Sequence, residues 1–451
     1  MQNRVSINLP AATAAEIAGD AVIRRLQEVG YQAFRVGGAV RDRLLGRVPR
    51  EVDVATDATP ARVKQLFPHT YAVGESFGVV IVHTEKGVDI EVATFREERE
   101  YADGRHPRDV RFSTPGKDAR RRDFTVNSLF YDPVNKEVLD FVGGLADLRA
   151  GVIRAIGNPR ERFREDHLRL LRAVRFSAGL RFKIDPDTAA ACRDRAASIK
   201  RISDERIFAE LRRMLTPGVA APSFALLHRL DLLPEILPEV ADMTGVKQPP
   251  RFHPEGDVWQ HTLLMLSFLR LDREVLAWAT LLHDVGKPPT QHFAEDRIRF
   301  PRHAQKGAEL SKIILRRLKA PRSLIDNVYE CVRNHMAFMD VPNMKKSTLR
   351  RLIARPTFPD ELELHRLDCR ASHGKFDNYV MLLDKMVEFS VEKAVPPPLV
   401  TGHDVKSMGV PEGPEIGRLL DRVQERQLEG EVNTREEALA ALREEIAESG
   451  V

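Results

Sequence analysis

Residues 34–56 read FRVGGAVRDRLLGRVPREVDVAT, and this stretch decides the fold of the N-terminal third. Its apolar run ends at two glycines, which predicts a strand, a tight turn and then a helix. Further on, Glu51 and Asp53 alternate with valines, so we expect a second strand with both acids on one face. Converging carboxylates repel unless a cation lies between them. The pair therefore predicts a magnesium site open to phosphate oxygens, and the alternative is a solvated edge strand.

Gly37 and Gly38 lie between the predicted strand and helix, where exposed backbone N–H groups form an anion site. Arg41 and Asp42 follow in the first turn of that helix. A glycine pair alone is weak evidence, usually of a tight turn. A glycine pair shortly before an acid-x-acid strand is a much stronger signal for phosphate binding.

A third acid is available in residues 78–95, GVVIVHTEKGVDIEVATF, which predict a hairpin that turns at 84–87. Alternation places Asp89 and Glu91 on one face of its second strand, and periodicity does not choose between them. Three acids on adjacent strands with a glycine phosphate turn describe a two-metal site for nucleotidyl transfer.

Composition bounds the class of protein. The chain has 451 residues, of which 43% are hydrophobic and 30% charged, so we expect two to four domains. Lys plus Arg exceed Asp plus Glu by only 70 to 66, which leaves room for local basic faces but excludes a uniformly basic coat. The cysteines, Cys192, Cys331 and Cys369, lie too far apart for a disulfide framework or a cysteine zinc site. No apolar run approaches the roughly 18 residues of a membrane span, so we expect a cytoplasmic protein without a membrane partner.

Six segments in fixed order resemble the class II tRNA nucleotidyltransferases and bacterial poly(A) polymerases. These are VGGAVRD, EVDVAT, IEVATFR, YADGRHPRDVRF, RRDFTVNSL and REDHLRLLRAVRF, within residues 30–215. The resemblance implies an α+β protein whose mixed α/β head is of the polymerase-β type, followed by all-α parts. The expected domains are a head (1–150), a neck with a nucleotide-selecting motif (151–217), a body with an HD domain (218–395) and a tail (396–451). The run AVPPPLVTG at 394–402 is the expected linker into the tail.

The resemblance also implies roles for residues. It makes Glu51, Asp53 and Glu91 the metal-binding acids, with Glu91 favoured over Asp89, although the family's usual first acid is aspartate. The implied nucleotide-binding residues are Gly37, Gly38, Arg41, Asp42, Arg122, Asp123, Asn127, Asp166, Arg169 and Arg172. The charged stretch 96–118 resembles the family's flexible loop, which moves when the enzyme switches nucleotide.

The segment EDHLR at 165–169 permits an argument from chemistry. On one continuous helix, Asp166 and Arg169 would share a face and could address a single base. The carboxylate accepts from an exocyclic amine and the guanidinium donates to the adjacent ring nitrogen, a pattern that cytosine and adenine both offer. Uracil and guanine offer the opposite pattern, and each unsatisfied buried group costs roughly 1 to 3 kcal/mol. A surface ion pair is the alternative.

A second group of residues resembles the ligand set of HD-domain metal phosphohydrolases. It comprises His261, His283, Asp284, His303, His335 and Asp368. Imidazole and carboxylate ligands from several helices suit a divalent transition metal. Many HD regions attached to nucleotidyltransferases have only a structural part, so hydrolysis of 2′,3′-cyclic or monophosphate ends stays an open alternative.

Together these features predict an enzyme that adds C, C and A to tRNA 3′ ends from CTP and ATP, with magnesium in the head. A poly(A) polymerase, an enzyme restricted to A or CC addition, and an HD phosphohydrolase with an RNA-binding head are the alternatives. Candidate phosphate contacts are Lys345, Lys346, Arg350 and Arg351, although a solvated helix face explains them as well. The oligomeric state stays open.

Overall fold

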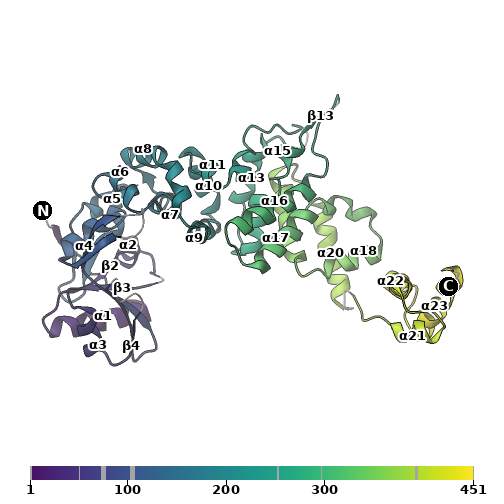
Figure 1. The fold of residues 1–451 in the computed structure, drawn as a ribbon, viewed down its shortest axis with the longest axis horizontal. Helices are drawn as coiled ribbons and strands as arrows, with labels where there is room; N and C mark the ends of the chain where they lie inside the picture. Colours follow the sequence, from purple (N-terminus) through teal and green to yellow (C-terminus); the bar gives the residue numbers. More distant parts are fainter. Residues whose placement is uncertain are drawn as a thin grey trace. The chain divides into compact units, whose positions relative to one another are not determined.

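The computed structural model describes residues 3–49, 51–72, 78–101, 107–250, 253–295, 297–391 and 395–449. The chain divides into two compact units, Met1–Pro238 and Glu239–Val451, drawn in Figure 1. The finer division into head, neck, body and tail stays a prediction. Among the described residues, none of the helices combines the length and the hydropathy that crossing a bilayer requires.

One mixed sheet organises the start of the first unit, with the strand order β1-β10-β9-β2-β3-β6-β5-β4. Its strands are β1 (Asn3–Ser6), β2 (Ala33–Val36), β3 (Asp53–Thr56), β4 (Thr70–Ala72), β5 (Val79–His83), β6 (Asp89–Thr94), β9 (Leu129–Asp132) and β10 (Glu137–Asp140). Strands β3 and β6 are parallel, and the other neighbours are antiparallel. The predicted hairpin is confirmed, because Gly87 closes its turn by donating to the Thr84 carbonyl at 2.9 Å.

Side chains alternate between the two faces of β3, β5 and β6, and helices cover one of these faces. Val54, Val80 and Val92 point to this face and pack with residues of α1 (Ala14–Glu28) and α3 (Pro60–Leu66). The side chains between these valines, which include both Asp53 and Glu91, therefore point to the opposite face. Farther along that opposite face, Phe34, Phe95 and Phe130 form a second core with α4 (Pro115–Arg121). Asp53 and Glu91 lie at the edge of this second core.

The structure corrects one expectation about the opening stretch. Helix α2 (Gly38–Leu44) follows the glycine pair as predicted, but β3 begins only at Asp53. Glu51 therefore lies in the segment before the strand, and the strand geometry assumed for both acids is wrong for the first. In the charged stretch 96–118, β7 (Arg96–Tyr101) and β8 (Pro107–Phe112) pair as an antiparallel hairpin. Its residues 102–106 lie outside the described part, and the motion expected of this loop stays a prediction.

The rest of the first unit is mainly helical. Its elements are η2 (Thr125–Asn127), α5 (Gly144–Ala150), β11 (Val152–Ile153), α6 (Pro159–Glu165), α7 (Arg169–Leu180), β12 (Lys183–Ile184), α8 (Pro186–Asp194), η3 (Ala196–Arg201), α9 (Asp204–Met214), α10 (Ala220–Arg229) and α11 (Leu233–Ile236).

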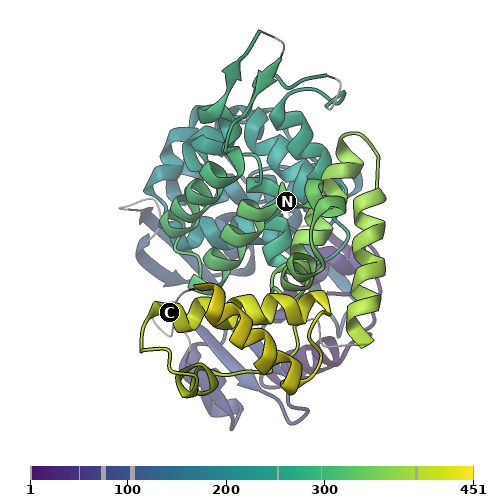
Figure 2. The same cartoon turned by 90° about the vertical axis from the view of Figure 1, so that its right-hand side faces the viewer.

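The second unit is helical apart from a short hairpin. Its elements, from the unit boundary onward, are α12 (Pro238–Ala241), α13 (Val258–Ser267), α14 (Glu274–Leu282), α15 (Lys287–Thr290), β13 (His292–Phe293), β14 (Ile298–Arg299), α16 (His303–Arg317), α17 (Arg322–Asn334), η4 (Ala337–Asn343), α18 (Lys346–Ile353), α19 (Phe358–Ala371), α20 (Asp377–Val391), α21 (Gly402–Ser407), α22 (Pro414–Glu429) and α23 (Arg435–Ser449). The last helices, in yellow in Figure 2, pack on one another, and their buried apolar residues form a core of their own. Residues 395–401, within the predicted linker, form neither helix nor strand.

Candidate active site

The register of two parallel strands brings two of the predicted acids together. Asp53 of β3 is the direct partner of Glu91 of β6, so their side chains lie side by side on the face opposite the valine core. Asp89 pairs instead with His83 on β5, and the Nδ1 atom of that histidine lies 2.7 Å from the Asp89 carboxylate. The geometry therefore places Glu91, rather than Asp89, beside Asp53.

The electrostatics of Asp53 show that this site is short of positive charge. Burial, with the neighbouring Glu91 and Glu51 carboxylates, raises the pKa of Asp53 to about 6, and Arg122 opposes this rise. A divalent cation would reverse this rise, because it favours the charged form of every carboxylate around it. Three carboxylates that share a site beside one arginine suit the oxygen coordination of magnesium.

The glycine turn lies next to these acids, since β2 pairs with β3 and Val36 is the partner of Asp53. Gly37 has φ 70° and ψ −132°, a conformation that residues with a side chain rarely adopt. A Cβ atom on Gly37 would also lie 3.2 Å from Nη1 of Arg122. Glycine is thus required both for the turn and for the close approach of this guanidinium, which Asp118 holds at 3.1 Å.

A buried polar network continues from the turn toward the neck. Arg41 donates to Asn127 at 2.6 Å, Asn127 donates to Asp123 at 3.2 Å, and Arg172 donates to Asp123 at 2.7 Å. Burial raises the pKa of Asp123, but the charge and hydrogen bond of Arg172 outweigh this and hold the pKa below its usual value. Both arginines also lie over the ring of Phe176, at 5.3 and 5.1 Å from its centroid. Sequence reasoning missed Phe176, which looks like an ordinary core position of an amphipathic helix.

The predicted base-reading pair does not lie on one helix. Helix α6 ends at Glu165, Asp166 has extended backbone (φ −140°, ψ 107°), and α7 begins only at Arg169. The shared-face argument is therefore wrong. Asp166 is instead held by Arg206 of α9, whose Nη2 lies 3.3 and 3.4 Å from the two carboxylate oxygens. Arg169 donates to the Glu165 carboxylate at 2.6 Å and to two backbone carbonyl groups. Arg206 lies 40 residues away, where no local pattern could reveal it.

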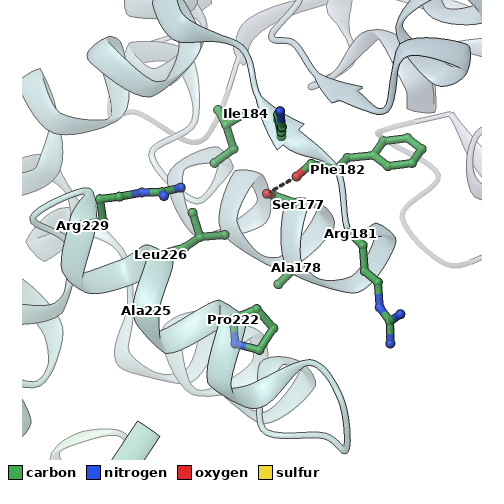
Figure 3. Close-up of a pocket in the computed structure, with 10 residues that line it drawn as sticks. Ser177, Ala178, Arg181, Phe182, Ile184, Pro222, Ala225, Leu226 and Arg229 are labelled. Carbon is green, nitrogen blue, oxygen red and sulfur yellow. Dashed lines mark hydrogen bonds between the residues drawn. The ribbon is translucent and has the colours of Figure 1, made fainter. Parts of the chain in front are cut away.

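A separate cavity of about 580 Å³ lies between α7, β12 and α10 (Figure 3). Figure 3 shows Leu226 and Arg229 of α10 on one side and Ser177 and Ala178 of α7 on the other. The described residues that line it are Ser177, Ala178, Arg181, Phe182, Lys183, Ile184, Pro222, Ala225, Leu226 and Arg229, which include three cations and no acid. The cavity shares no lining residue with the acid cluster of the sheet.

The predicted histidines of the second unit do come together. His283 and Asp284 directly follow α14, His303 begins α16, and His335 directly follows α17, and all four are buried. The Asp284 carboxylate lies 3.2 Å from Nε2 of His283, 3.7 Å from that of His303 and 4.0 Å from that of His335. On α13, Nε2 of His261 is 3.2 Å from Asp368 of α19.

Hydrogen bonds to the other ring nitrogens prepare these histidines for a metal. The Nδ1 atoms of His283, His303 and His335 lie within hydrogen-bonding distance of the backbone carbonyls of residues 280, 300 and 332, which directs Nε2 toward Asp284. Burial, together with the nearby His303 and His283, lowers the pKa of His335 to about 3, so this imidazole is neutral and able to act as a ligand. The cluster fits a divalent transition metal.

Two residues near this cluster were not predicted. Glu255 and His253 lie in the segment that leads into α13, and the Glu255 carboxylate is 2.6 Å from Nδ1 of His261 and 2.9 Å from Nδ1 of His253. A second carboxylate that orients a ligand histidine is common at metal sites, but its position in a loop gave no periodic signal. Among the predicted phosphate contacts, Arg350 is buried against the ring of Phe389 at 4.6 Å, so its guanidinium does not face solvent as expected.

Comparisons with known proteins agree with this arrangement. Family models match residues 33–154 ("Poly A polymerase head domain"), 181–244 ("Probable RNA and SrmB-binding site of polymerase A") and 256–368 (HD domain). The poly(A) polymerase I of Salmonella typhi is 41% identical over 231 residues, which are 49% of this chain and 49% of that enzyme. The chain thus matches about half the length of that relative.

Two further comparisons extend over nearly the whole chain. The crystal structure of the Bacillus stearothermophilus CCA-adding enzyme in complex with CTP is 28% identical and superposes with a TM-score of 0.72, covering 98% of this chain and 100% of that one. The predicted α+β fold is thereby confirmed. The CCA-adding enzyme of Leuconostoc mesenteroides is 30% identical over 420 residues, 93% of each chain. A match of this extent shows the family: the chain belongs to the CCA-adding enzymes, with a head of the poly(A) polymerase type.

Proposed function

We propose that this protein adds C, C and A to the 3′ ends of tRNA, using CTP and ATP and no nucleic-acid template. The observation that carries the proposal is the register that sets Asp53 beside Glu91, next to a glycine turn and Arg122. The match to a CCA-adding enzyme over 93% of both chains supports tRNA as the substrate.

In the proposed reaction, Asp53, Glu91 and Glu51 hold magnesium, which when bound would activate the terminal RNA hydroxyl and neutralise the triphosphate. The turn at Gly37 and Gly38 receives the triphosphate through backbone N–H groups. Arg122 reinforces this site from the side opposite Glu91. The RNA hydroxyl attacks the α-phosphate, a new phosphodiester bond forms, and pyrophosphate leaves.

We assign base selection to Asp166 and Arg169, although the two residues do not lie on one continuous helix. Asp166 accepts from the exocyclic amine of cytosine or adenine, and Arg169 donates to the adjacent ring nitrogen. Arg206 keeps the carboxylate in place through its two contacts. The buried network of Arg41, Asn127, Asp123 and Arg172 forms the support behind the incoming nucleotide.

Poly(A) addition is the nearest rival, and the extent of the matches argues against it. The poly(A) polymerase relative is more identical but matches only 49% of the chain, whereas the CCA-adding relative continues through 93%. An enzyme restricted to CC or to A addition would share the same extent. The product must therefore be read directly.

The test is to incubate the protein with magnesium and tRNAs that end before C, after C or after CC, with CTP, ATP or both. Stepwise addition that stops after CCA supports the proposal, and a long A tail, or addition limited to CC or to A, refutes it. Asp53→Asn should remove activity, because it takes a charge from the acid cluster. Asp57→Asn is the matched control, since the Asp57 carboxylate accepts from the Gln32 backbone at 2.8 Å just beyond the same strand and Asp57 is not one of the proposed metal-binding acids.

We propose a second function for the second unit, where His283, Asp284, His303 and His335 converge. A divalent transition metal bound there would supply an activated water for hydrolysis of phosphate esters at RNA 3′ ends. The test substrate is an RNA ending in a 2′,3′-cyclic phosphate, offered with nickel, manganese or cobalt. Opening of the cyclic phosphate to a terminal phosphomonoester that is lost in His335→Ala and kept in Asp53→Asn supports this activity. Hydrolysis without any nucleotide addition would instead indicate a phosphohydrolase whose head only binds RNA.

A further inference from the structure

The catalytic face of the sheet continues outward from the acids. In the register of four neighbouring strands, Asp53 is paired with Glu91, Glu91 with Ile81 of β5, and Ile81 with Tyr71 of β4. Direct partners point to the same face, so these four side chains form one row. At about 5 Å for each strand, the Tyr71 backbone is about 10 Å from that of Glu91.

The outer end of this row is aromatic and exposed. Tyr71 lies on β4, the last strand in the sheet order, and its side chain is 57% exposed. The ring of His83, which is on the same face of β5, lies edge-on to it with centroids 6.4 Å apart. Asp89 contacts Nδ1 of His83 at 2.7 Å and so fixes the orientation of this ring. The acid that is not beside Asp53 thus has a different role, which is to hold an aromatic neighbour of Tyr71.

The stereochemistry of the proposed reaction requires the RNA to approach from this end of the row. Nucleotidyl transfer proceeds in line, so the attacking hydroxyl and the leaving pyrophosphate lie on opposite sides of the α-phosphate. The glycine turn at Gly37 and Arg122 lie on the β2 side of Asp53. The triphosphate therefore occupies that side, and the RNA strand must approach from the side of β5 and β4.

We infer that Tyr71, supported by His83, is a stacking platform for the 3′-terminal base of the RNA acceptor strand. This inference rests on the proposed nucleotidyl transfer. Stacking on an aromatic ring accepts every base, which suits an acceptor end whose last base changes after each addition. The platform positions the RNA and takes no part in selecting the incoming nucleotide, which is assigned to Asp166 and Arg169.

The first test separates RNA binding from nucleotide binding in steady-state addition of C. Tyr71→Ala should raise KM for tRNA about tenfold and leave KM for CTP unchanged, because base stacking has this magnitude. Tyr71→Phe keeps the ring and should restore the wild-type KM. Tyr329→Ala is the matched control, since it removes a tyrosine of α17 in the second unit. An unchanged KM for tRNA in Tyr71→Ala would overturn the inference.

A second readout does not depend on catalysis. A tRNA whose 3′-terminal base is 2-aminopurine reports stacking through quenching of its fluorescence. Binding to the wild type and to Tyr71→Phe should quench the signal, and binding to Tyr71→Ala should not. Equal quenching by the wild type and both variants would refute the platform even if CCA addition is observed. Loss of quenching in Tyr71→Ala alone would support it even if the added nucleotides differ from C and A.

Discussion

Removing Arg206 should weaken the discrimination between bases without stopping nucleotide addition. In the structure this guanidinium is the long-range partner of Asp166, the proposed acceptor for the amine of C or A. In Arg206→Ala the carboxylate loses both contacts. It keeps one local bond, because the backbone N–H of Leu168 donates to its Oδ1 at 3.1 Å. The side chain of Asp166 therefore stays near the site but is less well oriented.

The magnitude follows from the geometry of these contacts. Distances of 3.3 and 3.4 Å are long for a charge-assisted hydrogen bond, and the two side chains are 26% and 23% exposed. A partly solvated pair of this kind contributes about 1 kcal/mol. If all of this stabilisation serves the orientation of Asp166, the ratio of kcat/KM for CTP over UTP should fall roughly fivefold.

The assay is single-nucleotide addition to a tRNA that lacks its 3′ CCA, with CTP and UTP measured separately. Arg213→Ala is the matched control, because Arg213 is on the same helix, is 64% exposed, and makes a long ion pair of 3.6 Å with Glu210 rather than with Asp166. The control should keep the wild-type ratio. An unchanged ratio in Arg206→Ala would refute the orienting role of Arg206. A ratio near one would show that Arg206 does more than orient the carboxylate.

Three further predictions concern stability, catalysis and metal binding. Asp123→Ala should lower the free energy of unfolding in urea by about 3 kcal/mol. The control Asp194→Ala removes an exposed carboxylate and should lower it by less than about 1 kcal/mol. Because the pKa of Asp123 is depressed in the folded state, its contribution to stability is complete above about pH 4. As the pH falls further, the difference in free energy of unfolding between the wild type and Asp123→Ala should disappear. Glu51→Asp should keep nucleotide addition and Glu51→Ala should abolish it, whereas full activity of the alanine variant would show that Glu51 is no ligand. His335→Ala should lose nickel binding in calorimetry and keep CCA addition; unchanged binding would exclude His335 as a ligand.

Much of the head could be predicted from sequence because its signals are local. The glycine turn, the helix that follows it and the hairpin at Thr84–Gly87 each depend on a few neighbouring residues. The choice of Glu91 over Asp89 needed a family resemblance, because alternation places both on one face. The register of β3 against β6 then gives the physical reason, and no pattern within either strand contains that information.

The failures at the site have a common cause. Periodicity assumed that Asp166 and Arg169 share a helix, but the backbone breaks between Glu165 and Arg169. The same reasoning treated Arg350 as a surface cation, whereas tertiary packing buries it on Phe389. Partners such as Arg206 come from distant helices. Local patterns therefore predict which residues are polar, and only the tertiary fold decides which of them meet.

One set of contacts links the proposed base-reading pair to the proposed triphosphate side of the site. Arg169 donates from Nη2 to the carbonyl of Arg121 at 3.1 Å, and Arg162 donates to the same oxygen at 3.3 Å. The next residue, Arg122, approaches Gly37 and lowers the pKa of Asp53 against the effect of burial and of the neighbouring acids. A base that displaces Arg169 therefore disturbs the backbone that carries Arg122. Because one peptide segment joins the two sites, a mismatched base should be rejected through slower transfer as well as through weaker binding.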